Sequence, residues 1–160
     1  MIYPKNIGTD KASEKIKQYC TYQERCHQET AKKLYSFGLY PQEVNRLLAM
    51  LIEENYLNEE SFAIAYAGGK FRINNWGKSK IKLALKQKQL SDYCIKKGLA
   101  SIDEDAYLGK LLKLSETKWL LLKNEKNIFV KKYKLQQYLL QKGFESSSIT
   151  DCINQIKDGK

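Results

Sequence analysis

The sequence has few helix-breaking residues and no long apolar run. It contains two prolines among 160 residues, and Lys, Leu, Gln and Glu are abundant, a composition that favours an all-α fold. No stretch reaches the roughly 18 uninterrupted apolar residues that indicate a membrane-spanning helix, so we expect no membrane association. The N-terminal segment also lacks an apolar run of signal-peptide length, which predicts a cytoplasmic protein.

Groups that support catalysis are scarce. His27 is the only histidine, and nothing in the sequence pairs it with a nucleophile. The segment Gly68-Gly69-Lys70 is too short to hold phosphates as a P-loop does. Acidic pairs such as Glu59-Glu60 fall where we expect helix N-termini, a position that the helix dipole favours for negative charge. We therefore expect a protein that is not an enzyme and that binds no cofactor.

The cysteines indicate neither a disulfide framework nor a metal site. Four cysteines are present, and disulfides are rare in cytoplasmic proteins. Cys20, Cys26 and His27 are the only closely spaced candidate ligands, and their spacing matches no standard zinc motif. The sequence therefore predicts that no metal is bound.

Arginine is scarce in a basic chain. Arg25, Arg46 and Arg72 are the only arginines, although the formal net charge is +10. Lysine is a compact point charge, whereas the planar arginine fork suits bidentate contacts to guanine or carboxylate. The charge therefore suits phosphate backbones or an acidic protein better than the reading of bases. For any single lysine, the alternative is a solvated surface position without a partner.

A spaced pattern of apolar residues occurs three times along the chain. It has seven places, at offsets 0, 4, 8, 9, 14, 18 and 21, and only Thr30 and Gln89 depart from an apolar residue or a glycine. Agreement at so many places indicates an internal repeat. The three copies are Thr30, Leu34, Gly38, Leu39, Val44, Leu48 and Leu51; Ile81, Leu85, Gln89, Leu90, Ile95, Leu99 and Ile102; and Leu135, Leu139, Gly143, Phe144, Ile149, Ile153 and Ile156.

Each copy of the pattern predicts two short helices joined by a tight turn. Places 0 and 4 lie one turn apart on one helix face, and places 14, 18 and 21 form the buried stripe of a second helix. Place 8 ends the first helix, where a glycine can adopt the left-handed conformation. Leu34, Leu85 and Leu139 share place 4, so we expect them at equivalent buried positions.

A third helix precedes each pair. The candidate segments are 16–26, 59–66 and 105–112, and the last two begin with acidic residues that suit a helix N-terminus. The sequence therefore predicts three tandem three-helix repeats that form an elongated, curved module. The expected boundaries are an N-terminal tail at 1–14 and repeats at 15–57, 58–102 and 103–157.

Three motifs carry more information than the apolar pattern alone. The start of the middle repeat, with the residue before it, reads Leu57-Asn58-Glu59-Glu60-Ser61-Phe62-Ala63-x-x-Tyr66, and the same repeat contains Trp76-Gly77-Lys78-Ser79-Lys80-Ile81. The last repeat contains Leu135-x3-Leu139-x3-Gly143-Phe144. Together these motifs resemble the RecX regulators of the RecA recombinase, and the resemblance extends over residues 15–157.

The resemblance implies a protein that binds RecA and its nucleoprotein filament and inhibits its ATPase and strand-exchange activities in recombination and DNA repair. The alternative is a helical nucleic-acid-binding module that acts directly on DNA through a lysine-rich face, with weak and largely non-specific binding. In either case we expect a monomer.

The family usually carries several arginines where this chain has Ala67-Gly68-Gly69-Lys70-Phe71-Arg72. We expect the helix to end or bend at the two glycines of this segment.

The middle repeat holds most of the positive charge. Residues 58–102 contain nine basic and three acidic residues, a net charge of +6. Lys78, Lys82 and Lys86 recur every four residues, which predicts one exposed stripe on a helix. Such a stripe can follow a phosphate backbone or an acidic protein surface, and its alternative is a solubilising helix face.

The residues expected to contact RecA or DNA extend beyond this stripe. Trp76 can stack on a base or fill an interface pocket, although a lone tryptophan at a helix junction more often fills a core. For Trp119 we expect a position in a core. A second lysine cluster precedes Leu135 in the last repeat. The full set of contact candidates is Lys70, Arg72, Trp76, Lys78, Lys80, Lys82, Lys86, Lys131, Lys132 and Lys134.

Overall fold

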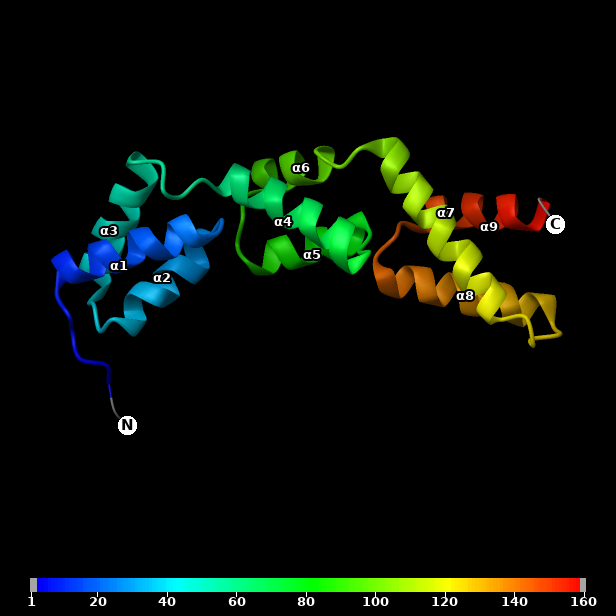
Figure 1. Cartoon of the computed structure of the whole chain (residues 1–160), viewed down its shortest axis with the longest axis horizontal. Helices are drawn as coiled ribbons and strands as arrows, with labels where there is room; N and C mark the ends of the chain where they lie inside the picture. The colour runs from blue at the N-terminus through cyan, green and yellow to red at the C-terminus, as the bar shows by residue number, and fades with distance from the viewer. Residues whose placement is uncertain (1–2, 159–160) are drawn as a thin grey trace. The chain divides into compact units, whose positions relative to one another are not determined.

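The computed structural model describes residues 3–158, with side chains placed for residues 3–156 (Figure 1). This part of the chain contains helices and no strand, which confirms the predicted all-α fold. The helices are α1 (Thr9–Tyr22), α2 (His27–Ser36), α3 (Pro41–Glu53), α4 (Glu59–Asn74), α5 (Lys78–Gln87), α6 (Asp92–Ala100), α7 (Glu104–Leu121), α8 (Ile128–Lys142) and α9 (Ser146–Asp158).

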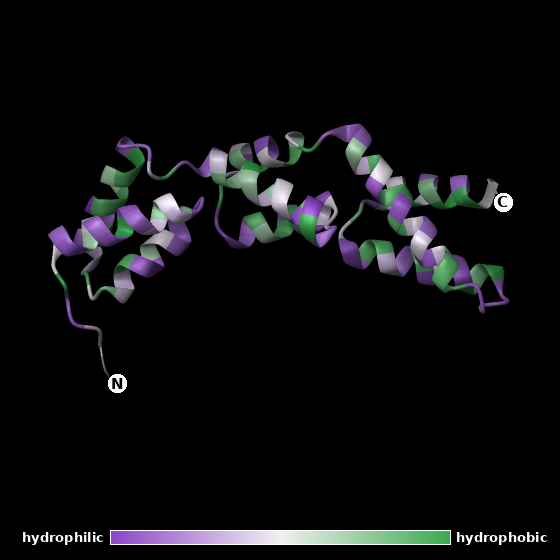
Figure 2. Cartoon of the chain, in the orientation of Figure 1, coloured by the Kyte–Doolittle hydropathy of each residue, from purple (hydrophilic) through white to green (hydrophobic). Residues whose placement is uncertain are grey.

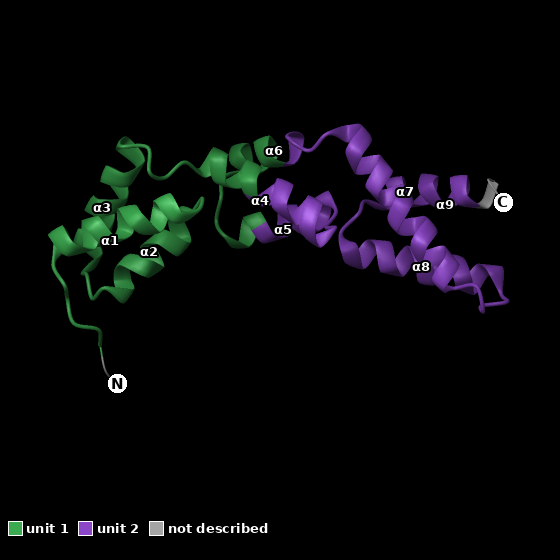
Figure 3. Ribbon diagram, viewed as in Figure 1, with its two compact units in different colours: residues 1–65, 85–98 green, residues 66–84, 99–160 purple. Residues whose placement is uncertain are grey.

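The helices divide into two compact units (Figure 3). Unit 1 contains residues 1–65 and 85–98, and unit 2 contains residues 66–84 and 99–160. The division passes through α4 and α5, so the middle repeat contributes to both units. The predicted limits of the tail and of the three repeats stay predictions.

Hydrophilic and hydrophobic residues are interleaved along each helix (Figure 2). This is the composition of amphipathic helices that bury one face against their neighbours. Among the described residues, no helix combines the length and the apolar character that crossing a membrane requires.

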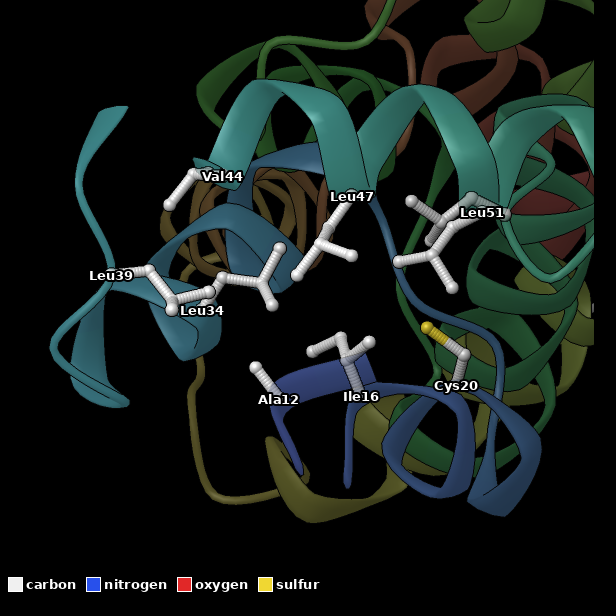
Figure 4. Close-up of a cluster of buried hydrophobic side chains, with 9 residues drawn as sticks. Ala12, Ile16, Cys20, Leu34, Leu39, Val44, Leu47 and Leu51 are labelled. Atoms are coloured by element: carbon white, nitrogen blue, oxygen red, sulfur yellow. The ribbon is translucent and has the colours of Figure 1, made fainter. Parts of the chain in front are cut away.

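Helices α1, α2 and α3 enclose a hydrophobic core in unit 1 (Figure 4). Helix α1 begins at Thr9, before the predicted start of the first repeat, because Ala12 is buried in this core and its N–H donates to the carbonyl of Gly8 at 3.0 Å. It ends at Tyr22 rather than at residue 26, because Cys26 is the N-cap of α2. The core residues are Ala12, Ile16, Cys20, Leu34, Leu39, Val44, Leu47, Leu51 and Leu57.

The turn after the first helix of each pattern has the predicted left-handed conformation. The φ angles at place 8 are 82° at Gly38, 66° at Gln89 and 98° at Gly143. Gln89 adopts this conformation although it is not a glycine. The predicted end of the first helix is therefore confirmed in all three copies.

The leucines at place 4 occupy equivalent buried positions. Leu34, Leu85 and Leu139 are each fully buried, which confirms that part of the repeat pattern. The buried stripe of the second helix differs from the prediction, because place 17 is buried in all three copies and place 18 is half-buried. The residues at place 17 are Leu47, Gly98 and Cys152.

Helix α4 runs without interruption from Glu59 to Asn74, so the predicted end of the helix at the two glycines is wrong. Each glycine costs a helix interior about 1 kcal/mol relative to alanine. Phe71 lies beyond both glycines and is buried, and we attribute the continuous helix to this packing. In unit 1, Gly98 lets α6 approach α4 closely, since a Cβ at residue 98 would lie 2.7 Å from the carbonyl oxygen of Ala63.

Candidate functional site

The first residues of α5 are held by the last repeat, within unit 2. The backbone N–H groups of Gly77 and Ser79 donate to carbonyl oxygens at the C-terminal end of α8, at 2.8 and 2.9 Å. The N–H of Lys78 donates to the hydroxyl of Tyr107 at 2.8 Å. N–H groups at a helix start have no partner inside the helix, so these three bonds fix where α5 begins.

Gly77 lies directly against Gly143. A Cβ at residue 77 would lie 2.4 Å from the carbonyl carbon and oxygen of Gly143, and a Cβ at residue 143 would lie 2.3 Å from the Cβ of Lys80. Gly143 also has a left-handed φ of 98°. The structure thus gives the Trp76–Ile81 motif a physical reason, because α5 can dock on α8 only if residue 77 has no side chain.

Replacing Gly77 with alanine is expected to lower the free energy of unfolding by about 1–3 kcal/mol, because the added carbon meets backbone atoms that cannot rotate away. Gly69→Ala is the matched control. A Cβ at residue 69 meets nothing within 4 Å, and the residue lies inside α4, so alanine should stabilise the protein by about 1 kcal/mol. Urea denaturation measures both changes. Equal effects of the two substitutions would show that the docking of α5 does not depend on residue 77.

Trp76 holds two of the predicted contact lysines beside its ring. The Nζ atoms of Lys70 and Lys80 lie 4.9 and 4.8 Å from the centroid of the ring. Trp76 is half-buried, so the expectation that it fills a core is wrong. Its ring instead stabilises two neighbouring ammonium groups by cation–π attraction.

The predicted stripe on α5 is only partly exposed. Lys82 and Lys86 are exposed, as expected. The side chain of Lys78 is 22% exposed, and its Nζ lies 3.5 Å from a carboxylate oxygen of Glu104. The same Nζ lies 4.7 Å from the ring centroid of Tyr107. The prediction of an exposed position is therefore wrong for Lys78, which belongs to the joint between α5 and α7.

Arg72 is exposed near the end of α4. Lys110, which the sequence analysis did not identify, binds the same end of this helix. The Nζ of Lys110 donates to the carbonyl oxygens of Phe71 and Arg72, at 3.0 and 3.1 Å. Burial, followed by the charges of Lys113 and Arg72, lowers the pKa of the Lys110 ammonium. No local spacing could have identified Lys110, because the residues that it binds lie far away in the sequence.

The lysines of the last repeat have different partners. The Nζ of Lys131 lies 4.0 Å from the ring centroid of Trp119, and Trp119 is half-buried rather than part of a core, which corrects the prediction. The Nζ of Lys134 lies 3.1 Å from a carboxylate oxygen of Glu125, and this hydrogen bond is the main cause that lowers the pKa of that carboxyl. Lys132 is half-buried and lines a groove between α8 and α9.

A second groove, between α7 and α8, is lined by one of the predicted lysines, Lys134. It has a volume of about 640 Å³, and its lining includes Lys118, Lys134 and Tyr138. Gln141 lines the same groove, and its backbone carbonyl oxygen accepts a hydrogen bond of 3.5 Å from the Nζ of Lys80. Lys80 therefore adjoins the groove, which we call the basic groove. None of the residues that line it is acidic, and the Glu125 carboxylate that pairs with Lys134 is not part of the lining.

The cysteines take no part in these surfaces. Burial raises the pKa of the thiols of Cys20, Cys26 and Cys152. In the part of the chain that the structure describes, no group of three His, Cys, Asp or Glu side chains is placed to hold a metal ion.

The helical repeats and the lysine-rich surface of unit 2 define a basic, all-α repeat protein. A family model described as the second three-helix domain of RecX matches residues 58–99. A model described as the third three-helix domain of RecX matches residues 105–153, and the two matches together cover more than half of the chain. The chain belongs to the RecX family.

Individual relatives agree with this assignment. The regulatory protein RecX of Clostridium perfringens (strain 13 / Type A) is 33% identical over 136 residues, which cover 82% of this chain and 60% of the relative. That of Bacillus mycoides (strain KBAB4) is 26% identical over 156 residues, which cover 97% of this chain and 57% of the relative. The chain thus spans less than two thirds of the length of these curated relatives. The crystal structure of RecX from Lactobacillus salivarius has the same fold, with a TM-score of 0.84 over 93% of this chain and 96% of that chain at 23% identity.

Proposed function

We propose that this chain binds the RecA recombinase and its DNA filament and inhibits the ATPase and strand-exchange activities of RecA in the bacterial cytoplasm. The observation that carries the proposal is the match of residues 58–99 and 105–153 to the second and third three-helix domains of RecX. The net charge of +10 supports it, because a nucleoprotein filament presents phosphates.

The proposed contacts are made through the exposed side of α5 and, within unit 2, through the Trp76 cluster (Lys70, Trp76 and Lys80) and the basic groove. Lys82 and Lys86 are exposed on a helix whose first N–H groups are bound by the last repeat. Lys80 lies beside the Trp76 ring and adjoins the basic groove. Side chains that are already ordered lose less conformational entropy on binding, so this arrangement suits an anionic partner.

The double variant Lys82→Glu and Lys86→Glu is expected to lose inhibition of RecA ATP hydrolysis on single-stranded DNA. Both side chains are exposed and lie one turn apart on α5, so the change reverses charge without removing packing. Lys11→Glu with Lys15→Glu is the matched control, since these lysines are also exposed and one turn apart, on α1. The control variant should inhibit RecA as the wild type does.

The same assay tests the proposed inhibition of RecA separately from the proposed contact residues. Wild-type protein that leaves RecA ATP hydrolysis unchanged would reject the proposed function. If the wild type and both double variants inhibit equally, the function stands and the contact does not depend on the exposed side of α5. The first alternative surface is then the cluster of Lys131, Lys132 and Lys134.

The basic groove favours a second function, direct binding of DNA without RecA. It brings Lys118 and Lys134 together with Tyr138, and Lys80 adjoins it. Lysines and aromatic rings along one groove suit a phosphate backbone with its bases. Such binding weakens steeply with salt, so DNA affinity measured against salt concentration in the absence of RecA tests this function.

A further inference from the structure

Helix α8 carries two large aromatic side chains that are mostly exposed. Phe129 is 77% exposed and Tyr133 is 61% exposed. They are four residues apart in one helix, so their rings leave the same face one turn apart. Apolar surface is costly to leave in water, so two adjacent exposed rings make this face a candidate binding surface.

Both rings line the groove between α8 and α9, which we call the aromatic groove. It has a volume of about 250 Å³. The side-chain amides of Gln136 and Asn154 line it, together with the ammonium-bearing side chain of Lys132. No acidic residue is part of its lining. The groove therefore combines aromatic faces, hydrogen-bonding amides and a positive charge.

We infer that the aromatic groove binds an unpaired base of single-stranded DNA. The rings of Phe129 and Tyr133 give a base a surface on which to stack. The amides of Gln136 and Asn154 each offer a donor and an acceptor to the edge of the base. Lys132 supplies a positive charge for the neighbouring phosphate. In a duplex the base faces are stacked and their edges are paired, so the groove selects single strands.

Tyr133 connects this site to the basic groove, because its side chain lines both grooves. A single strand whose phosphates contact Lys118 and Lys134 in the basic groove can therefore place one of its bases on the Tyr133 ring, in the aromatic groove. The inference rests on the second function proposed above, direct binding of DNA. It adds to that function a site and a preference for single strands.

A protein partner suits the aromatic groove less well. The centres of protein interfaces are desolvated pockets filled by apolar or aromatic side chains. In this groove, the side-chain amides of Gln136 and Asn154 would each need a polar partner once covered, because burying an unpaired polar group is costly. A nucleotide offers an apolar face, a polar edge and a phosphate together.

The test measures binding of fluorescein-labelled oligo(dT) and of a matched hairpin duplex, closed by a non-nucleotide linker so that it has no unpaired base, to the full chain, without RecA, by anisotropy over a range of salt concentrations. The double variant Phe129→Ala and Tyr133→Ala is expected to bind oligo(dT) about 5-fold to 150-fold more weakly, the equivalent of stacking one base. Its salt dependence should equal that of the wild type, because no charge is removed. Its affinity for the hairpin should not change.

Three further variants make the test specific. Tyr93→Ala is the matched control, since Tyr93 is also 61% exposed and has Lys97 beside its ring, with Nζ 5.5 Å from the centroid. It should bind both probes as the wild type does. Tyr133→Phe should keep the affinity, because stacking needs the ring and not the hydroxyl. Lys132→Gln should reduce the salt slope for oligo(dT) by about 0.7 on logarithmic axes.

Four results would overturn the inference. An equal loss of affinity for oligo(dT) and the hairpin, or a double variant that binds like Tyr93→Ala, would remove the base site and leave direct DNA binding intact. Wild-type protein that binds neither probe would remove both the site and the function on which it rests. A double variant that keeps DNA binding but no longer inhibits RecA ATP hydrolysis would assign the groove to a protein contact instead.

Discussion

A Leu139→Ala variant is expected to lose about 2–4 kcal/mol of the free energy of unfolding. The side chain of Leu139 is 0% exposed and occupies the place equivalent to Leu34 and Leu85. Truncation removes buried apolar surface and leaves a cavity that close-packed neighbours fill only in part. Urea denaturation followed by circular dichroism measures the loss as a shift of the unfolding midpoint.

Leu140→Ala is the control for this prediction. Leu140 is the next residue of the same helix and is 37% exposed, so the two substitutions change helix propensity equally and differ in burial. We expect a loss of less than about 1 kcal/mol for Leu140→Ala. Equal losses at the two positions would contradict the assignment of place 4 of the repeat to the core.

The repeat pattern predicts the helix turns better than it predicts the buried face of the second helix. The turn at Gln89 is left-handed although glycine is absent there, because the apolar places before and after it bring two helices together. In the second helix, Cys152 and Ile153 are adjacent, and both fit a helical period. Only the packing of neighbouring helices decides that Cys152 is buried and Ile153 half-buried.

The candidate site could be predicted from composition and helix spacing, but not its side-chain pairs. Lys82 and Lys86 are exposed as expected, because Leu85 fixes the buried side of the helix. The pairing of Lys78 with Glu104 joins residues 26 positions apart, and Lys131 lies over Trp119 from another helix. Such pairs depend on how helices dock, which local spacing does not encode.

Tyr107 joins several segments of unit 2 at one point. Its ring packs against those of Phe71 and Phe144, with centroids 5.7 and 5.3 Å apart. Its hydroxyl accepts the N–H of Lys78 at 2.8 Å and donates to the carboxylate of Glu145. Burial, followed by the hydrogen bond to Glu145, raises the pKa of this hydroxyl, so it stays protonated and remains a donor.

We therefore expect Tyr107→Ala to lower the free energy of unfolding by about 3–5 kcal/mol, since it removes a fully buried aromatic ring. Tyr107→Phe keeps the ring and removes only the hydroxyl, so the N–H of Lys78 and the carboxylate of Glu145 lose their partner, at a cost of about 1–3 kcal/mol.

Tyr93→Phe, at an exposed position, should leave stability unchanged in the same urea titration. If Tyr107→Phe is as stable as the wild type, the hydroxyl is replaceable by water, and the start of α5 is held by its other backbone bonds alone. A measurable loss instead shows that the Tyr107 hydroxyl contributes, beside the two backbone bonds from Gly77 and Ser79, to holding the start of the helix that presents Lys82 and Lys86.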